Sequence, residues 1–352
     1  MTKIFARTVG CDLGDKYSHV CVLNEHGEVD HRARIATSRV GFRKWFSELA
    51  TCTVVVETGT HSRWVAQLLS DLGHEVIVAN ARHVRLIYHG HRKNDRLDAE
   101  KLARLARADI KLLRPIKHRS DATQTELALL RNRDQLVAAR TQLINHVRGV
   151  AKSFGVRIRK CDAASFGRHA HKELPEALHQ GMQPLLAALQ AVSDQIKAYD
   201  KQLSELAQAN IEVQPILQIG GVGPITALAY VHTIEDPERF ARNRDAAAFF
   251  GLVPGQNQSG SHDPALSISK AGDGFVRRLL INCAQYILGP FGKDCDLRRY
   301  GLRLQERGGS HAKKKAVVAV ARKLAVLMLH LWKTGEVYEP LHAPQRRLPK
   351  AA

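Results

Sequence analysis

The sequence is poor in aromatic residues, with three tryptophans, seven tyrosines and ten phenylalanines among its 352 residues. We therefore do not expect a row of stacked rings, which is how many proteins hold single-stranded bases. Apolar runs long enough to cross a membrane are also missing, and the first residues lack the pattern of a secretory signal. These absences predict a cytoplasmic protein with no membrane partner.

Cysteine is scarce as well, and none of the six cysteines belongs to a C-x-x-C pair. The spacing between them matches no structural zinc site. Scattered cysteines of this kind are typical of proteins from a reducing compartment. The sequence therefore predicts neither structural zinc nor a disulfide framework.

Positive charge, in contrast, is abundant. Lys and Arg number 53 against 34 for Asp and Glu, which gives a formal net charge of +19 and a pI of about 9.9. This balance favours a polyanionic partner and lies in the range expected of nucleic-acid-binding proteins. The length allows two or three domains with a sizeable core.

Residues 8–79 alternate between short apolar runs and amphipathic segments. The expected strands are 8–13, 18–24, 29–36, 53–57 and 75–79, and the expected helices are 39–50 and 61–72. The first three strands follow one another closely enough to pair antiparallel, whereas the later strands alternate with helices. The sequence therefore predicts an α/β domain with a mixed sheet.

Four carboxylates are placed where this domain could bring them together. Asp12 lies in the first expected strand, and Glu57 ends the fourth. Asp95 and Asp98 lie three residues apart in the stretch His91–Leu105, where a helical period begins, and such positions share a helix face. Taken alone, this stretch is better explained by a capped surface helix. Clustered carboxylates need cations to neutralise them, and an all-oxygen set suits Mg²⁺, with Mn²⁺ as a possible substitute.

Basic residues crowd around the two aspartates of this stretch. Arg92, Lys93 and Arg96 lie next to Asp95 and Asp98 in the sequence. Acidic groups that converge in a basic neighbourhood are what a metal-dependent enzyme acting on polyphosphate needs. We therefore predict that these three cations contact nucleic acid.

Residues 117–210 carry apolar residues at heptad spacing. One series, repeating every seven residues, is Leu129, Leu136, Leu143 and Val150. A second series runs from Leu185 to Leu206 with alternating spacings of four and three. This pattern predicts two long helices. An intramolecular helical hairpin and an oligomerising coiled coil fit it equally well.

A glycine-rich stretch, 216–227, has the pattern of a helix–hairpin–helix. Gly221 and Gly223 would let the backbone pass close to a phosphate, and the following helix would offer free N–H groups. An ordinary glycine-rich connection between helices is the alternative. We favour phosphate contact because the chain is so basic.

A polar loop follows the apolar segment that ends at Gly251. It includes Ser259, whose hydroxyl lies next to Gly260, although the residues alone assign it no catalytic role. Lys270, Arg277 and Arg278 come next and could hold a phosphate and stabilise negative charge in a transition state.

The order of the motifs resembles one known family. They are VGCDLGDK, VVVETGT, KNDRLDAEKLARL, IGGVGPITA, and FFGLVPGQNQSGS followed by SISKAGDGFVRRLL. Over nearly its whole length the chain resembles the bridge-RNA-guided insertion-sequence transposases, and it is similar to the Piv-type DNA invertases. The resemblance implies a RuvC-like (RNase H-like) N-terminal domain with a catalytic, metal-binding DEDD set. That set falls on Asp12, Glu57, Asp95 and Asp98.

The resemblance also implies a serine nucleophile, and Ser259 occupies its place. Relatives commonly show two serines before the conserved glycine of this motif. Here Gln258 occupies the first of these positions, and a further serine, Ser261, follows Gly260. Ser259 matches the motif better, and Ser261 stays the alternative.

The function implied is that of an RNA-guided DNA transposase or recombinase. Ser259 would attack a phosphodiester, and Mg²⁺ at the acidic set would assist. A structured noncoding guide RNA would pair with double-stranded donor and target DNA, so that base pairing selects the sequence. The protein would form a homo-oligomer, a dimer that becomes a tetramer in the synaptic complex, and would act in a prokaryotic cytoplasm on the nucleoid.

The implied domains are a RuvC-like DEDD domain (1–115), a helical coiled-coil arm (116–210), a mainly α-helical transposase domain with the helix–hairpin–helix and the serine loop (211–335), and a flexible basic tail (336–352).

Two other functions fit part of the pattern. A RuvC-type metal-dependent endonuclease, such as a junction resolvase, would use the acidic set with water as the nucleophile. A non-catalytic nucleic-acid-binding scaffold would use only the basic surface.

Overall fold

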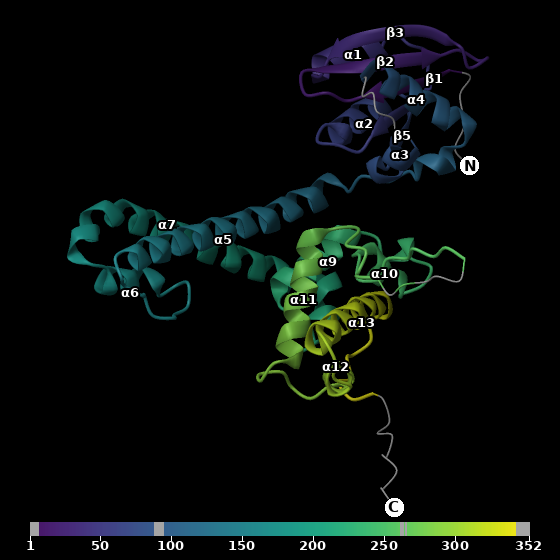
Figure 1. Cartoon of the computed structure of the whole chain (residues 1–352). Helices are drawn as coiled ribbons and strands as arrows, with labels where there is room; N and C mark the ends of the chain where they lie inside the picture. The colour runs from purple at the N-terminus through teal and green to yellow at the C-terminus, as the bar shows by residue number, and fades with distance from the viewer. Residues whose placement is uncertain (1–6, 88–94, 261–263, 265, 343–352) are drawn as a thin grey trace, which may run out of the picture. The chain divides into compact units, whose positions relative to one another are not determined.

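The computed structural model describes residues 7–87, 95–260, 264 and 266–342 (Figure 1). Contacts within the chain divide it into two compact units, Met1–Arg119 and Ser120–Ala352. The first unit is an α/β domain and the second is mostly helical, in agreement with the predicted class. The boundaries of the four predicted domains stay a prediction. Over the described ranges, every helix is too short or too polar to cross a lipid bilayer.

A five-stranded sheet organises the first unit. Its strands are β1 (Thr8–Asp12), β2 (Tyr17–Leu23), β3 (Val29–Ala36), β4 (Thr53–Glu57) and β5 (Glu75–Ala79). They lie in the order β3-β2-β1-β4-β5, with β1 in the centre. β2 runs antiparallel to β1 and β3, whereas β4 runs parallel to β1 and β5. The predicted mixed sheet is confirmed, and every strand lies within one residue of its predicted bounds.

Helices cover both faces of this sheet. They are α1 (Arg39–Phe46), α2 (Ser62–Asp71), α3 (Ala81–Ile87), α4 (Asp95–Ala108) and the 3₁₀ turn η1 (Ile110–Leu113). Successive residues of a strand point to opposite faces. Val9 and Val56 therefore pack with α1 and α2 on one face, and Val55 packs with Leu102 of α4 on the other. The α4 face carries the predicted acidic residues.

Helix α1 ends at Phe46, four residues before its predicted end. The hydroxyl of Ser47 donates a hydrogen bond to the carbonyl of Lys44 at 3.3 Å, and side-chain bonds of this kind compete with the helical pattern. Leu49 still packs against the core from the turn that follows. The apolar spacing therefore continues beyond the helix, which is why the predicted end was wrong.

Two long helices form an arm in the second unit (Figure 1). The arm contains α5 (Asp121–Ser153), α6 (Phe166–Glu173) and α7 (Glu176–Ala209). Arg133 of α5 donates to Asp200 of α7 at 2.8 Å. At the end that carries α6, Val147, Phe166 and Leu189 are fully buried in a small core of the arm's own. The heptad residues thus form an intramolecular hairpin, and an additional oligomeric contact stays a prediction.

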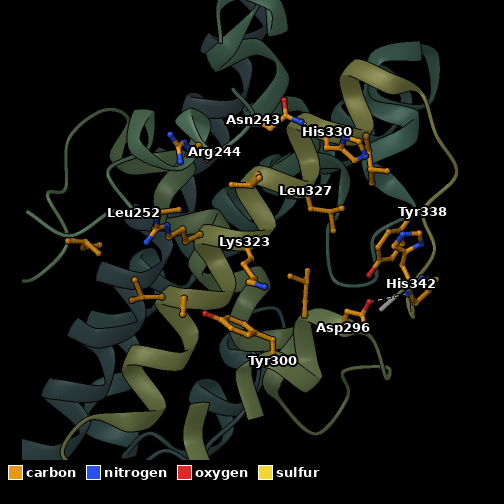
Figure 2. A pocket seen from close by; sticks show the side chains of 18 of the residues that line it. Asn243, Arg244, Leu252, Asp296, Tyr300, Lys323, Leu327, His330, Tyr338 and His342 are labelled. Carbon is orange, nitrogen blue, oxygen red and sulfur yellow. Dashed lines mark hydrogen bonds between the residues drawn. The ribbon is translucent and has the colours of Figure 1, made fainter. Parts of the chain in front are cut away.

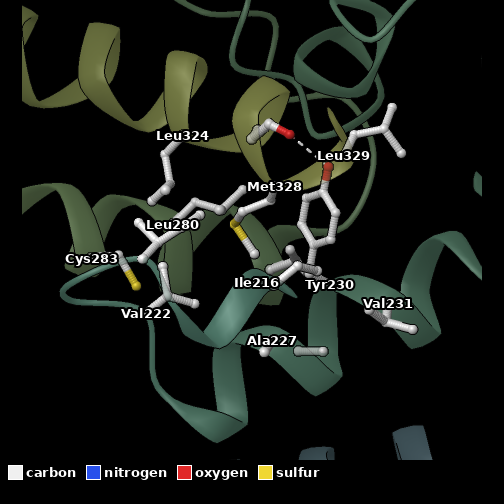
Figure 3. Close-up of a cluster of buried hydrophobic side chains, with 14 of the residues drawn as sticks. Ile216, Val222, Ala227, Tyr230, Val231, Leu280, Cys283, Leu324, Met328 and Leu329 are labelled. Atoms are coloured by element: carbon white, nitrogen blue, oxygen red, sulfur yellow. Dashed lines mark hydrogen bonds between the residues drawn. The ribbon is translucent and has the colours of Figure 1, made fainter. Parts of the chain in front are cut away.

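The rest of the second unit is a helical bundle. It contains η2 (Ile211–Val213), α8 (Gln214–Leu217), α9 (Pro224–Ile234), η3 (Pro237–Arg239), α10 (Asp245–Phe249), α11 (Gly274–Leu288), α12 (Asp296–Glu306) and α13 (Ala312–Thr334). Tyr230 of α9 is fully buried, and its hydroxyl donates to the carbonyl of Ala325 in α13 at 2.6 Å (Figure 3). Apolar side chains such as Met328 surround this contact. The core therefore joins helices that are distant in sequence.

Residues 336–342, the start of the predicted tail, are held against the helices. The N–H of Tyr338 donates to Oε1 of Gln218 at 2.9 Å. The N–H of Asp296 donates to the carbonyl of Pro340 at 2.8 Å, and the N–H of His342 donates to Oδ2 of Asp296 at 3.0 Å. These seven residues therefore belong to the folded unit, and residues 343–352 lie outside the described part of the chain.

Candidate functional site

The candidate acidic site begins at the end of the central strand. Asp12 is the last residue of β1 and points to the same face as Gly10, two residues earlier. A Cβ atom placed on Gly10 would lie 1.9 Å from the carbonyl oxygen of Ala99 and 2.7 Å from the nitrogen of Ala103, both in α4. The backbone of α4 therefore rests directly on β1, and only glycine leaves room for it.

This packing brings the first turn of α4 to Asp12. Carboxylate oxygens of Asp12, Asp95 and Asp98 all lie within 4.8 Å of one another. Asp12 and Asp98 are half-buried, whereas Asp95 is exposed, and Asp98 also pairs with Lys101 at 3.0 Å. Three convergent carboxylates provide the all-oxygen ligands that a hard divalent cation prefers. The donor set therefore fits such a cation.

Glu57, the fourth predicted acid, ends the neighbouring strand. The last recorded pair between β1 and β4 is Cys11 with Val56, so Glu57 occupies the next position along, beside Asp12. Adjacent strands lie about 4.7–4.9 Å apart. Glu57 is half-buried and shares its face with Val55, which packs against α4. Its position borders the group of three aspartates, which among the described residues is the group that could hold a metal ion and does not itself include Glu57.

Cys11 lies behind the acidic group, on the opposite face of the sheet. It is fully buried among apolar side chains. Burial, and to a lesser extent the negative charge of Asp12, raise the pKa of its thiol well above the ordinary value. The thiol therefore stays protonated and serves as an apolar wall, since only a thiolate binds metal strongly.

Helix α4 is also fixed from the side by an ion-pair network that the sequence did not reveal. Arg32 of β3 donates to Glu100 at 2.6 Å, and Arg104 donates to the same carboxylate at 2.8 Å. The hydrogen bond from Arg32, followed by that from Arg104, lowers the pKa of Glu100 below its ordinary value of 4.5. The spacing of Glu100 and Arg104 is a recognisable helical pair, but nothing local to either residue points to Arg32.

The serine loop, residues 251–272, lies in the second unit. Its two sides pair at the base, where the N–H of Gly255 donates to the carbonyl of Ser267 and the N–H of Ser269 donates to that of Val253, both at 2.9 Å. Gly272 has a φ of +71°, and a Cβ there would lie 1.9 Å from the carbonyl oxygen of Phe249. The base of the loop is therefore closely packed against the end of α10.

Ser259 lies in the distal part of this loop and is exposed. Gly260, which follows it, has a φ of +58°, a backbone conformation that favours glycine. The alternative serine, Ser261, lies outside the described residues. Ser259 thus belongs to the second unit, and the acidic residues belong to the first.

Two family models match the chain. One belongs to the DEDD transposases of the IS110 type, is described as "Transposase" and matches residues 9–155. The other, described as "Transposase IS116/IS110/IS902 family", matches residues 213–293. The transposase for insertion sequence element IS1111A from Coxiella burnetii is 31% identical over 349 residues, covering 94% of this chain and 91% of the relative. The chain belongs to the IS116/IS110/IS902 transposase family.

Two further relatives have similar names. A probable family 20 transposase from Pseudomonas aeruginosa is 29% identical over 341 residues, covering 94% of this chain and 98% of the relative. The transposase for insertion sequence element IS1328 from Yersinia enterocolitica is 29% identical over 282 residues, covering 79% of this chain and 82% of the relative. The protein is therefore a DNA transposase, and its DEDD-type domain with the three aspartates indicates a divalent cation.

The predicted nucleic-acid contacts near the aspartates are only partly described. Arg96 is exposed in the first turn of α4. Arg92 and Lys93 lie outside the described residues. The interpretation of these cations as phosphate contacts of the transposase stays a prediction.

The cations after the serine loop have different surroundings. Lys270 is exposed. Nη1 of Arg277 donates to the carbonyls of Phe250 and Ala271 at 3.0 and 2.8 Å, so its guanidinium ties both sides of the loop base together. Arg278 instead donates to Asp134 of α5 at 2.6 Å. Sequence reasoning predicted phosphate contacts here and missed the positioning role of Arg277.

The two predicted phosphate-binding glycines also differ from each other. Gly221 has a φ of +96°, and a Cβ there would lie 2.8 Å from the ring of Tyr286 in α11, so this glycine allows close packing. Gly223 is exposed and precedes Pro224, the first residue of α9. The N–H of Thr226 donates back to the carbonyl of Gly223 at 3.0 Å. Of the two, Gly223 has the exposure that a phosphate contact needs.

A groove of about 1490 Å³ lies along α13 of the transposase (Figure 2). One wall is a face of α13, and the others come from α12, the base of the serine loop and residues 336–342. Lys323 lies over the ring of Tyr300 at 4.1 Å. The residues that line the groove include none of the predicted catalytic ones, so it is not part of the acidic site.

Proposed function

We propose that this transposase cleaves and rejoins DNA by transesterification, with Ser259 as nucleophile and the acidic set as the metal-binding site. The observation that supports it most is the convergence of Asp12, Asp95 and Asp98 within 4.8 Å in a chain of a transposase family. The resemblance of the loop FFGLVPGQNQSGS to the serine motif of RNA-guided transposases supports Ser259 as the nucleophile. We also assign the first unit to the RuvC-like fold class, consistent with its strand order.

Each acid has a defined place in this proposal. Asp12 and Asp98, both half-buried, would hold Mg²⁺ or Mn²⁺ together with the exposed Asp95, and Glu57 would complete the set from β4. A bound divalent cation supplies positive charge that activates a hydroxyl and stabilises negative charge on phosphoryl oxygens. Gly10 and Glu100 position α4, and with it Asp95 and Asp98, against β1.

The serine step is a balanced exchange of ester bonds. The Oγ atom of Ser259 attacks the phosphorus, the P–O bond to one DNA strand breaks, and the serine proton passes to the departing strand oxygen. The phosphoserine ester keeps the energy of the phosphodiester, so a second strand end can reverse the step and rejoin. Arg277 keeps the base of the loop closed during this exchange.

The partners follow from the same resemblance. A guide RNA that pairs with donor and target DNA would leave the protein to bind backbones, consistent with its net charge of +19 and its few aromatic residues. A complex that holds two DNA duplexes requires several copies of the chain, as a dimer or tetramer. Its substrate would be the chromosome of a prokaryotic cell, at the nucleoid.

The experiment that tests the nucleophile compares three serine variants. Purified protein is incubated with guide RNA, both DNAs and Mg²⁺, and the covalent protein–DNA adduct is measured on denaturing gels. We expect Ser259→Ala to abolish the adduct, and Ser267→Ala, an exposed serine at the base of the same loop, to retain it. If Ser259→Ala forms the adduct and Ser261→Ala does not, Ser261 is the nucleophile.

The same gels distinguish the alternatives. A junction resolvase would release hydrolysed DNA with no adduct, and the names of the relatives do not favour it. A non-catalytic scaffold would keep its biological activity in Asp12→Asn and Asp98→Asn. We expect both variants to lose strand cleavage while still binding DNA.

A further inference from the structure

The tip of the arm is the end of α5 and α7 that carries α6 (Figure 1). A small basic cavity lies there, between the end of α5 and the residues that follow it. Its volume is about 220 Å³, and it is lined by Arg148, Lys152, Arg157, Ile158 and Lys160. Four of its five lining residues are therefore cationic. A water molecule takes up about 30 Å³ in the liquid, so the cavity has room for a phosphate group.

Among the described residues, none of these four cations has a carboxylate partner. Two carboxylates close to these cations in the sequence have other partners. Glu173 accepts from the backbone of Arg159 at 2.8 Å and pairs with its guanidinium at 3.1 Å. Asp162 accepts from the N–H and the hydroxyl of Ser165, both at 2.8 Å. Four like charges around one cavity repel one another, which favours an anion between them.

Arg148 supplies a second and independent observation. Its guanidinium lies 5.1 Å from the ring of Phe166, which is fully buried in the core of the arm. Its Nε atom is buried and has no hydrogen-bond partner in the described part of the chain. A buried donor left without an acceptor is unfavourable. Arg148 also lines the cavity, and the planar fork of a guanidinium suits phosphate oxygens.

We propose that the arm tip binds a phosphate group of a nucleic-acid backbone. The inference rests on the transposase function for the identity of the anion, but on neither the serine mechanism nor RNA guidance. Arg148 would form the fixed wall of the site, and the exposed Arg157 and Lys160 would close over the phosphate. Duplex DNA and structured RNA share this chemistry, so the test includes both.

The test removes two exposed cations and measures binding. The variant Arg157→Ala/Lys160→Ala is titrated with a random-sequence DNA duplex and, separately, with a hairpin RNA, in EDTA, at several salt concentrations. A plot of log K against log salt has a negative slope, and each lost phosphate contact makes that slope shallower by about 0.9 for duplex DNA. For the loss of two contacts we expect the slope with duplex DNA to become shallower by about 1.8. The affinity at about 0.1 M salt should then fall roughly 60-fold.

The matched control is Lys197→Ala/Lys201→Ala on α7. These lysines pair with Asp194 at 3.3 Å and Glu205 at 3.9 Å on their own helix, away from the cavity. The control removes the same net charge, and we expect it to change the slope much less. Thermal melting of both variants checks that the exposed substitutions leave the fold intact.

Each outcome has a defined meaning. A loss with one nucleic acid alone identifies that one as the ligand of the tip. Equal effects in the tip variant and the control, or no effect in the tip variant, would overturn the inference and leave the transposase function untouched. Failure of the unmodified protein to bind either nucleic acid would instead count against the proposed function itself.

Discussion

The packing of α4 on β1 leads to a sharp prediction for Gly10→Ala. The added methyl group would lie 1.9 Å from the carbonyl oxygen of Ala99, whereas ordinary contact begins at 3.4 Å. The atom it meets is backbone, so no side chain can move aside. We therefore expect α4 to shift outward by about 1.5 Å, which is the difference between these two distances.

Such a shift has two measurable consequences. Overpacking of this kind destabilises by about 1–3 kcal/mol, and 1 kcal/mol lowers the Tm of a domain of about 100 residues by roughly 4–8 °C. The shift also carries Asp95 and Asp98 away from Asp12. Because a misplacement of about 1 Å can cost about 10²-fold in rate, we expect strand cleavage to fall by at least that factor and cation affinity to fall with it.

The assays are thermal unfolding, calorimetric titration with Mg²⁺ or Mn²⁺, and strand cleavage. Gly59→Ala is the matched control, because the same methyl group there meets nothing within 4 Å and Gly59 also lies near the end of β4. We expect this control to behave as the unmodified protein does. A Gly10→Ala protein with unchanged Tm and unchanged cation affinity would refute the close packing of helix on strand.

Three further predictions follow from neighbouring contacts. Glu100→Gln should lower the Tm at neutral pH. Because folding depresses the pKa of Glu100 below 4.5, the difference in Tm between the variant and the unmodified protein should shrink as the pH falls below about that value. A difference in Tm that stays constant across pH would contradict this prediction. Arg277→Lys should open the loop base to limited proteolysis within 252–270, whereas Arg278→Lys, which lies next to it but pairs with Asp134, should not. Asp98→Asn should weaken Mn²⁺ binding in calorimetry while leaving DNA affinity within a few-fold, and equal loss of both would point to misfolding.

Much of the first unit is readable in the sequence because its strands are short, apolar and separated by clear turns. The run TVVVE marks β4, and the alternation from Val29 to Ala36 marks an edge strand, β3. The convergence of Asp95 and Asp98 follows from helical spacing alone. Asp12 joins them if β1 is central in the sheet and α4 packs on the end of β1, and these were the only two further conditions.

The anchoring of that helix was not readable in the same way. Gly10 is a single glycine in a strand, a signal of close backbone approach, but the sequence does not say which backbone approaches. The bond from Arg32 to Glu100 joins residues 68 positions apart. Neither residue differs in its local pattern from the many other charged residues of this chain.

The heptads show the same division between local and long-range information. Their spacing predicts that Asp121–Ser153 and Glu176–Ala209 are helices, since each apolar stripe repeats with the helix itself. It does not say what covers the stripe. The structure pairs α5 with α7 of the same chain, through Arg133 and Asp200 among others.

By itself, the sequence determined the strands and the mixed sheet of the first unit, the two long helices of the arm and the basic character of this transposase, because periodicity and residue type are local properties. Only the tertiary structure decided that Gly10 admits α4, that Arg277 closes the serine loop and that four cations of the arm tip share one cavity. Such contacts depend on which surfaces meet in space. Residues with the same local sequence pattern contact different partners, because tertiary packing determines which side chains come together.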